Sequence, residues 1–267
     1  MSRKQEFGLL GLLLLAGLAI RLSFFIPFQG SDDIGYNEAA YHLASGTYRL
    51  EPNLFYLRFG VILPMALSFK LLGVSPLASS LSLLVCSLLM IVLAYAVASH
   101  LFDRRVAWLA AILMAVFPLN VFSATEVHAD LPMSLYLGLA LLFILKADAA
   151  EDSRRQIAWG AASGVFWGVA YLTKIPALLT FPAFLVGYRL ATKKRLGRIL
   201  IPLAIGFLAV AAVEMTVYIV YTGDPLYQVH TILRQGHTQA IDRAYPDWRA
   251  GLKAVLTVYP DMMFNLL

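Results

Sequence analysis

Residues 76–101 read PLASSLSLLVCSLLMIVLAYAVASHL and contain no Asp, Glu, Lys or Arg. At about 1.5 Å of rise per residue, a helix of this length can cross the roughly 30 Å hydrocarbon core of a bilayer. Similarly apolar blocks, with at most one charge each, occupy residues 7–28, 106–122, 131–145, 157–172, 176–190 and 201–221. The sequence therefore predicts an all-α, polytopic membrane protein with about seven transmembrane helices.

The overall composition and the distribution of charge support this prediction. The 267 residues are 60% hydrophobic and 14% charged, whereas a soluble domain usually carries about a quarter charged residues. The net charge is +5, but the basic residues cluster in short loops between apolar blocks, as the positive-inside rule describes. This pattern does not indicate a nucleic-acid partner. Cys86, the only cysteine, lies within a predicted span, so no intramolecular disulfide can form.

The orientation depends on residues 58–73, which are apolar but interrupted by Gly60, Pro64 and Lys70. If this segment spans, the later basic clusters fall on the side opposite Arg3-Lys4, which violates the positive-inside rule. We therefore expect residues 32–45 and 58–73 to form two interfacial amphipathic helices on the outer face, with a cytoplasmic N-terminus. Residues 1–221 would form the membrane module, with residues 29–75 as its outer loop, and residues 222–267 would form an outer-side segment.

Three carboxylates at the predicted outer face are candidates for chemistry. Asp32 and Asp33 begin the first interfacial helix, and Asp130 lies at the start of a predicted span. A carboxylate at a helix N-terminus is stabilised by the helix dipole, so capping is one interpretation of each residue. The other interpretation is that Asp130 faces the Asp32-Asp33 pair across a cavity at the outer interface.

Several short motifs occur in a characteristic order along the chain. They are Gly30-Ser-Asp-Asp-Ile-Gly-Tyr, Leu101-Phe-Asp-Arg-Arg, Phe117-Pro-Leu-Asn, Ala129-Asp-Leu-Pro and Leu172-Thr-Lys-Ile-Pro. This order resembles the GT-C glycosyltransferases, especially the branch of protein O-mannosyltransferases and lipid A aminoarabinose transferases. The similarity covers most of residues 7–230, and order and spacing carry it more than identity.

The resemblance implies an integral-membrane, inverting glycosyltransferase of the cell envelope that uses a polyprenyl-phosphate sugar. The acceptor would be a hydroxyl of a lipid, glycan or protein at the outer membrane face. The family's catalytic base falls on Asp32 or Asp33, and a second family acid falls on Asp130. The phosphate-contacting cations fall on Arg58 and Lys174, although snorkelling at a helix end is an alternative for both. Family members are commonly longer, so we expect a minimal or truncated member.

The residue types at these positions suit that reaction. A lipid phosphate leaves readily, a carboxylate can take the proton of the acceptor hydroxyl, and cations can stabilise the departing phosphate. No cofactor is expected. Glu126, His128 and Asp130 could bind a divalent metal, but Mg²⁺ prefers oxygen ligands and we do not favour this interpretation.

Arg21 and Glu214 are the two charges clearly inside predicted spans. Unpaired charges are costly there, so we expect a structural ion pair between them. A transporter or lipid flippase is an alternative function, in which these two charges would line the substrate path. Transporters usually show internal repeats and broken helices, and the sequence indicates neither. A non-catalytic fragment or scaffold subunit is a further alternative.

Overall fold

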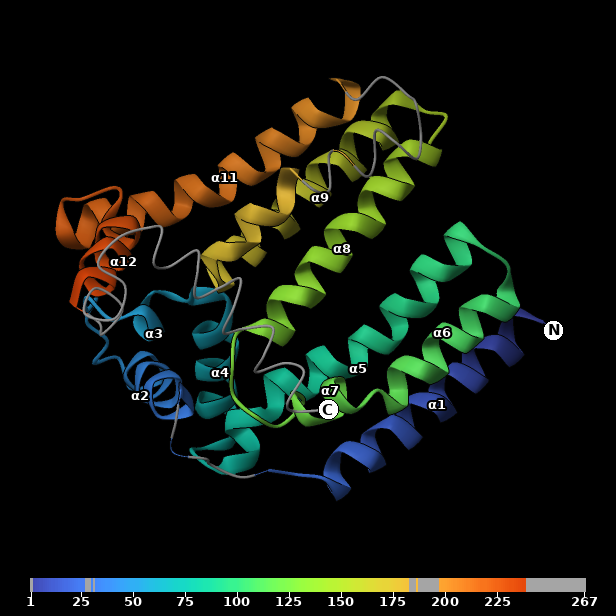
Figure 1. Ribbon diagram of the computed structural model, residues 1–267, viewed down its shortest axis with the longest axis horizontal. Coiled ribbons are helices and arrows are strands. Elements are labelled where there is room, and N and C mark those ends of the chain that lie inside the picture. Colours follow the sequence, from blue (N-terminus) through green and yellow to red (C-terminus); the bar gives the residue numbers. More distant parts are fainter. Residues whose placement is uncertain (1, 27–29, 31, 183–185, 187–196, 239–267) are drawn as a thin grey trace, which may run out of the picture.

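The computed structural model describes residues 2–26, 30, 32–182, 186 and 197–238, and within these ranges it contains helices and no strands. Six long helices form a bundle: α1 (Arg3–Ser23), α5 (Pro76–Leu101), α6 (Arg104–Val116), α8 (Asp130–Ala149), α9 (Ser153–Thr173) and α11 (Gly197–Thr222). Shorter helices gather towards one end of this bundle (Figure 1): α2 (Asp32–Ser45), α3 (Leu54–Leu57), α4 (Phe59–Leu72), α7 (Pro118–Phe122) and α12 (Tyr227–Thr238).

Four helices of the described chain are long and apolar enough to cross a membrane: Lys4–Ser23, Pro76–Leu101, Asp130–Ala149 and Ile199–Thr222. These helices confirm an all-helical, polytopic membrane protein, but they do not confirm the predicted number of seven spans. The predicted block 176–190 begins with a short 3-10 helix, Ile175–Leu179. Most of its second half lies outside the described residues.

The predicted span over residues 106–122 is broken, which corrects the expectation that no helix is interrupted. The first part, α6, ends at Val116, and α7 begins at Pro118. Proline lacks the N–H that would continue the helical ladder and disfavours helical backbone in the residue before it. Phe117 accordingly adopts extended backbone (φ −61°, ψ 118°). The break leaves α6 and α7 on one side of a cavity described below.

Contacts at the two ends of the bundle define the path of the chain. At one end, Glu6 near the start of α1 contacts Arg104 at the start of α6, with 3.1 Å between Oε2 and Nη2. At the other end, the Ile26 N–H donates to the Thr125 hydroxyl (3.1 Å), and the Ser80 hydroxyl donates to the Thr125 carbonyl (2.7 Å). The end of α1 and the start of α5 therefore lie together. Residues 58–73 do not carry the chain across the bundle, in agreement with the positive-inside argument.

Both segments that the sequence predicts as interfacial helices are helical and form α2 and α4, while their position at the membrane interface stays a prediction. Helix α2 spans the predicted residues 32–45 and is followed by Gly46, whose φ of +74° is readily adopted by glycine. Helix α4 buries one face in the bundle but exposes a second apolar face, which consists of Leu63, Leu67, Leu71 and Leu72. An apolar exposed face suits contact with lipid chains rather than with water.

Helices α9 and α11 pack closely because small residues face each other. A Cβ on Gly164 would lie 1.9 Å from the Leu203 carbonyl oxygen, and a Cβ on Gly206 would lie 2.2 Å from the Ala161 carbonyl oxygen. Small residues allow such backbone approach in membrane helices, where dispersion contacts drive association. This packing positions α9, which ends at Thr173 directly before Lys174.

Candidate functional site

The start of α4 and the end of α9 meet where the two predicted phosphate-binding cations lie. A Cβ on Gly60 would lie 2.0 Å from Thr173 Oγ1, so only glycine permits this approach. Arg58 precedes α4, and Lys174 directly follows α9. The contact therefore brings both cations to the same end of the bundle, although they are far apart in the sequence.

Each cation already has a partner in the structure. The Arg58 guanidinium donates a hydrogen bond to the Tyr36 hydroxyl and lies 5.6 Å and 5.8 Å from the ring centroids of Tyr36 and Phe55. Lys174 Nζ donates to Asp130 Oδ1 at 2.6 Å. Arg58 is thus positioned by aromatic rings and Lys174 by a carboxylate. Tyr36 was not identified as a candidate from the sequence, where it was only an aromatic residue of an interfacial helix.

The structure places Asp32 and Asp33 in different environments. The Asp33 side chain is buried, and its carboxylate accepts hydrogen bonds from the backbone N–H groups of Gly30 (3.2 Å) and Ile34 (3.0 Å). Asp32 is exposed, with no hydrogen-bond partner among the described residues. Asp33 therefore stabilises the local backbone at the start of α2, while Asp32 presents its carboxylate at the surface.

Asp32 and Asp130 both lie near Tyr36 and His128. Burial raises the pKa of the Tyr36 hydroxyl and lowers the pKa of the His128 ring. The carboxylates of Asp32 and Asp130 lie close enough to both groups to act on them electrostatically, raising both pKa values. The fold thus brings two of the three predicted acids together around Tyr36 and His128.

Asp130 lies in the first turn of α8 but makes no capping hydrogen bond through its side chain, and Ala129 occupies the N-cap position. Its carboxylate pairs with Lys174, and its backbone N–H donates to His128 Nδ1 at 3.2 Å. Because Nδ1 accepts this bond, the ring proton of neutral His128 lies on Nε2. Nε2 is 3.9 Å from Glu126 Oε2. Sequence reasoning considered Glu126 and His128 only as metal ligands.

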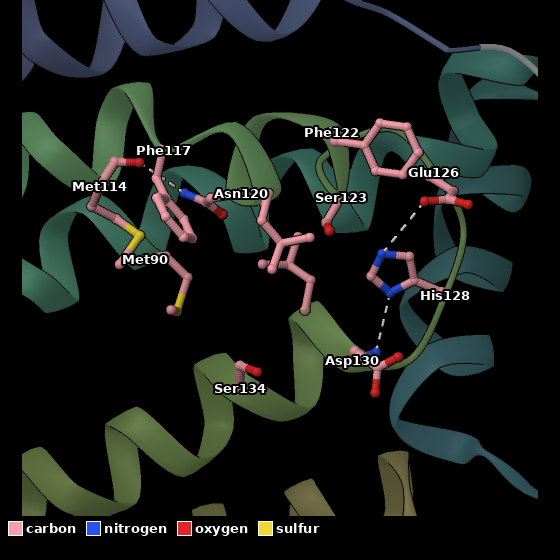
Figure 2. A pocket seen from close by; sticks show the side chains of 12 residues that line it. Met90, Met114, Phe117, Asn120, Phe122, Ser123, Glu126, His128, Asp130 and Ser134 are labelled. Carbon is pink, nitrogen blue, oxygen red and sulfur yellow. Dashed lines mark hydrogen bonds and ion pairs between the residues drawn. The ribbon is translucent and has the colours of Figure 1, made fainter. Parts of the chain in front are cut away.

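A cavity of about 450 Å³ lies beside Asp130 (Figure 2). Glu126, His128 and Asp130 form its polar end, and Met90, Met114 and Phe117 lie at the opposite end. The remaining lining residues are Leu119, Asn120, Phe122, Ser123, Leu131 and Ser134. Because α6 and α7 are separated at Phe117, their side chains form one wall of this cavity, which we call the α7 pocket.

A polar residue inside the predicted span 106–122 marks the inner wall of the α7 pocket. Asn120 Oδ1 accepts a hydrogen bond from the Ser87 hydroxyl (3.0 Å), and its side-chain amide donates to the Met114 carbonyl (3.1 Å). The amide thereby satisfies a carbonyl near the end of α6. Asn120 and Pro118 were the sequence signals for this break in an otherwise apolar block.

No group of three or more His, Cys, Asp or Glu residues in the described ranges is arranged to hold a metal ion. The expectation that the protein needs no metal or other cofactor stays a prediction.

The predicted ion pair between Arg21 and Glu214 is wrong. The buried Arg21 donates from Nε to the Ser87 hydroxyl (2.6 Å) and from Nη1 to the Gly17 and Ala115 carbonyl oxygens (2.8 and 3.1 Å). Glu214 instead accepts a hydrogen bond from the Tyr218 hydroxyl at 2.9 Å. Arg21 lies in the last turn of α1, which ends at Ser23, five residues before the predicted end of the block at residue 28. The two charged side chains thus form hydrogen bonds within separate groups of helices, and the buried Arg21 Nη2 has no partner among the described residues.

The chain is similar to one protein family. Neither a curated protein nor a solved structure matches the chain. A family model described as dolichyl-phosphate-mannose-protein mannosyltransferase matches residues 60–219, more than half of the 267 residues. The matched range includes Asp130 and Lys174 and begins after Asp32, Asp33 and Arg58. The chain therefore belongs to the dolichyl-phosphate-mannose-protein mannosyltransferase family of GT-C membrane glycosyltransferases.

Proposed function

We propose that the protein transfers a sugar from a polyprenyl-phosphate donor to an acceptor hydroxyl at the outer membrane face, with inversion at the anomeric carbon. Family membership supports the glycosyltransferase activity. The observation that carries the finer proposal is the juxtaposition of acids and cations at one end of the bundle. Asp32 and Asp130 act on common neighbours, and Asp130 is paired with Lys174.

The donor phosphate would bind Arg58 and Lys174. The polyprenyl chain remains in the hydrocarbon layer, so its phosphate must lie at headgroup depth, where the spanning helices end. Lys174 uses one of its three N–H groups for Asp130, and Arg58 uses one of its five for Tyr36. Both side chains retain donors for phosphate oxygens while their partners hold them in place.

Asp32 would act as the general base. In a single displacement, the acceptor oxygen bonds to the anomeric carbon, its proton moves to the Asp32 carboxylate, and the bond from the anomeric carbon to the phosphate oxygen breaks. Polyprenyl phosphate leaves as an anion that the two cations stabilise. Attack opposite the leaving group inverts the anomeric carbon. The exposed carboxylate of Asp32 suits this role better than that of Asp33, which the backbone already occupies.

The test is incubation of the protein in nanodiscs with a panel of polyprenyl-phosphate sugars and candidate acceptors, followed by mass spectrometry of released polyprenyl phosphate. We expect release from at least one donor. Asp32→Asn should lower turnover by about 10²- to 10⁴-fold while donor binding persists. Glu38→Gln, which alters another exposed carboxylate of α2, is the matched control and should retain turnover. Full activity in Asp32→Asn would reject the assigned base, and no release from any donor would reject the function.

A further inference from the structure

The α7 pocket has an apolar end and an acidic end. Its apolar end includes Met90, Met114 and Phe117, while its polar end carries the carboxylates of Glu126 and Asp130. His128 lies between these two carboxylates. Burial lowers its pKa, and its Nδ1 accepts a hydrogen bond from the Asp130 N–H. His128 is therefore neutral near pH 7. The pocket thus offers an apolar chain-binding region that ends in hydrogen-bonding groups with a net negative charge.

The cations of the site lie outside this pocket. Arg58 and Lys174 are not among its lining residues. Lys174 does contact Asp130, but through Oδ1 and from the end of α9. Asp130 therefore stands between the cationic part of the site and the pocket. An anionic headgroup would meet unfavourable carboxylates in the pocket and favourable cations beside it.

We propose that the α7 pocket binds the acceptor of the transfer reaction, and that this acceptor is an amphipathic molecule with an apolar chain and an uncharged, hydroxyl-bearing head. This inference rests on the proposed function. The chain would lie against Met90, Met114 and Phe117, and the hydroxyl would lie beside Asp130, next to the cations that hold the donor. A volume of about 450 Å³ is within the usual range for a small-molecule site.

The polar end can recognise a hydroxyl group specifically. His128 Nε2 and Glu126 Oε2 are 3.9 Å apart, which is too long for a hydrogen bond. Before transfer, the His128 ring N–H can therefore donate to the acceptor hydroxyl oxygen, and the Glu126 carboxylate can accept a hydrogen bond from that hydroxyl, whose proton moves to Asp32 during transfer. A carboxylate or phosphate head has no proton to donate and adds a like charge. The pocket should therefore discriminate by head charge at a fixed chain length.

The experiment compares three photoreactive probes, each with a diazirine near the end of its chain. The first is a long-chain alcohol, the second is the carboxylic acid with the same chain, and the third is a polyprenyl phosphate. Crosslinked peptides from the protein in nanodiscs are mapped by mass spectrometry. We expect the alcohol to label the peptides that contain Met90 and Met114, with about tenfold more labelling than the acid. Glu126→Gln should increase labelling by the acid relative to the alcohol.

A matched pair of variants tests the location. Ser134 is an exposed pocket residue one turn after Asp130, so Ser134→Trp places bulk in the pocket without filling a buried packing site. This variant should lose labelling by the alcohol while its affinity for the donor changes by less than about twofold. Ser23→Trp makes the same substitution at an exposed position of α1 that does not line the pocket. It should label like the wild type.

Three outcomes would overturn the inference. Labelling of the pocket by the polyprenyl-phosphate probe, with loss of donor affinity in Ser134→Trp, would assign the pocket to the donor. Equal labelling by alcohol and acid would reject the charge argument. Unchanged alcohol labelling in Ser134→Trp would reject the location. Release of polyprenyl phosphate from the donor tests the proposed function separately. Release without labelling of the α7 pocket by the alcohol would reject only the acceptor site, and labelling without release would reject the transfer reaction.

Discussion

Lys174 Nζ lies 2.6 Å from Asp130 Oδ1, so the end of α9 and the start of α8 are joined by an ion pair between residues 44 positions apart. Both side chains are partly exposed, with 28% of Lys174 and 57% of Asp130 accessible. Pairs at this exposure are screened by solvent and contribute little to the free energy of unfolding. The contact therefore positions the lysine more than it stabilises the fold.

Variants of the two partners should show that the pair matters for donor binding and contributes little to the stability of the fold. Lys174→Gln should weaken donor binding by about 1.5 to 3 kcal/mol if the ammonium contacts the phosphate directly. Asp130→Asn should leave the melting temperature nearly unchanged, because an exposed pair contributes at most about 1 kcal/mol. Donor affinity and thermal unfolding are measured for both variants in nanodiscs. Unchanged donor affinity in Lys174→Gln, and likewise in Arg58→Gln, would return both cations to the role of helix anchors.

Neutralising Asp33 should affect stability rather than chemistry. Its carboxylate accepts hydrogen bonds from the backbone N–H groups of Gly30 and Ile34, and loss of a typical hydrogen bond costs about 0.5 to 1.5 kcal/mol. Asp33→Asn should therefore lower the melting temperature, whereas Asp32→Asn should not. Thermal unfolding of the two variants under identical conditions checks this. The opposite order of the two melting temperatures would exchange the structural and catalytic assignments.

Ser87 should be more important for stability than an exposed serine of the same helix. It accepts the Nε–H of the fully buried Arg21 and donates to Asn120. Ser87→Ala leaves a buried guanidinium donor without its partner, at a cost of about 1 to 3 kcal/mol. Ser99→Ala, at an exposed position of α5, is the control. Equal unfolding free energies of the two variants would show that water replaces the lost contact.

The bundle ends should face opposite sides of the membrane. Thr47 lies after α2, Glu151 lies between α8 and α9, and both are exposed. With the buried Cys86 replaced by alanine, an impermeant maleimide applied from outside should label Thr47→Cys and not Glu151→Cys. The reason is the cytoplasmic excess of Lys and Arg near the span ends. The reverse labelling pattern would invert the topology and remove the site from the outer face.

His128 should make stability depend on pH. Burial lowers its folded-state pKa below the unfolded value of about 6.5. The folded state then binds fewer protons than the unfolded state between these two values, so stability falls as pH decreases through that interval and is fully retained above it. Protonation of Nδ1 would also remove the bond from the Asp130 N–H.

The pH effect is measured as the melting temperature between pH 7.5 and pH 5. His128→Asn keeps an acceptor for the Asp130 N–H but cannot titrate, so its melting temperature should fall less over this range. An identical pH dependence in the variant and the wild type would show that another group controls the acid response.

The sequence by itself determined most of the helices. Residues 76–101 and 32–45 have the predicted bounds, because hydropathy and helix-ending signals such as Gly46 depend on neighbouring residues. The charge distribution also indicated that residues 58–73 do not cross the bundle. The break at Phe117-Pro118 was visible in principle, since proline acts on the residue before it, but the apolar composition of the block concealed it.

Only the tertiary structure decided which charged groups meet. Asp32 and Asp33 are adjacent in sequence, yet packing of α2 buries one carboxylate and exposes the other. Arg21 was predicted to pair with Glu214, but α1 packs where the Ser87 hydroxyl and the Ala115 carbonyl accept hydrogen bonds from its guanidinium. Lys174 contacts Asp130 because glycines and other small residues allow α9 to pack closely against its neighbouring helices. Such contacts depend on helix rotation and separation, which are set by packing between distant segments rather than by local sequence.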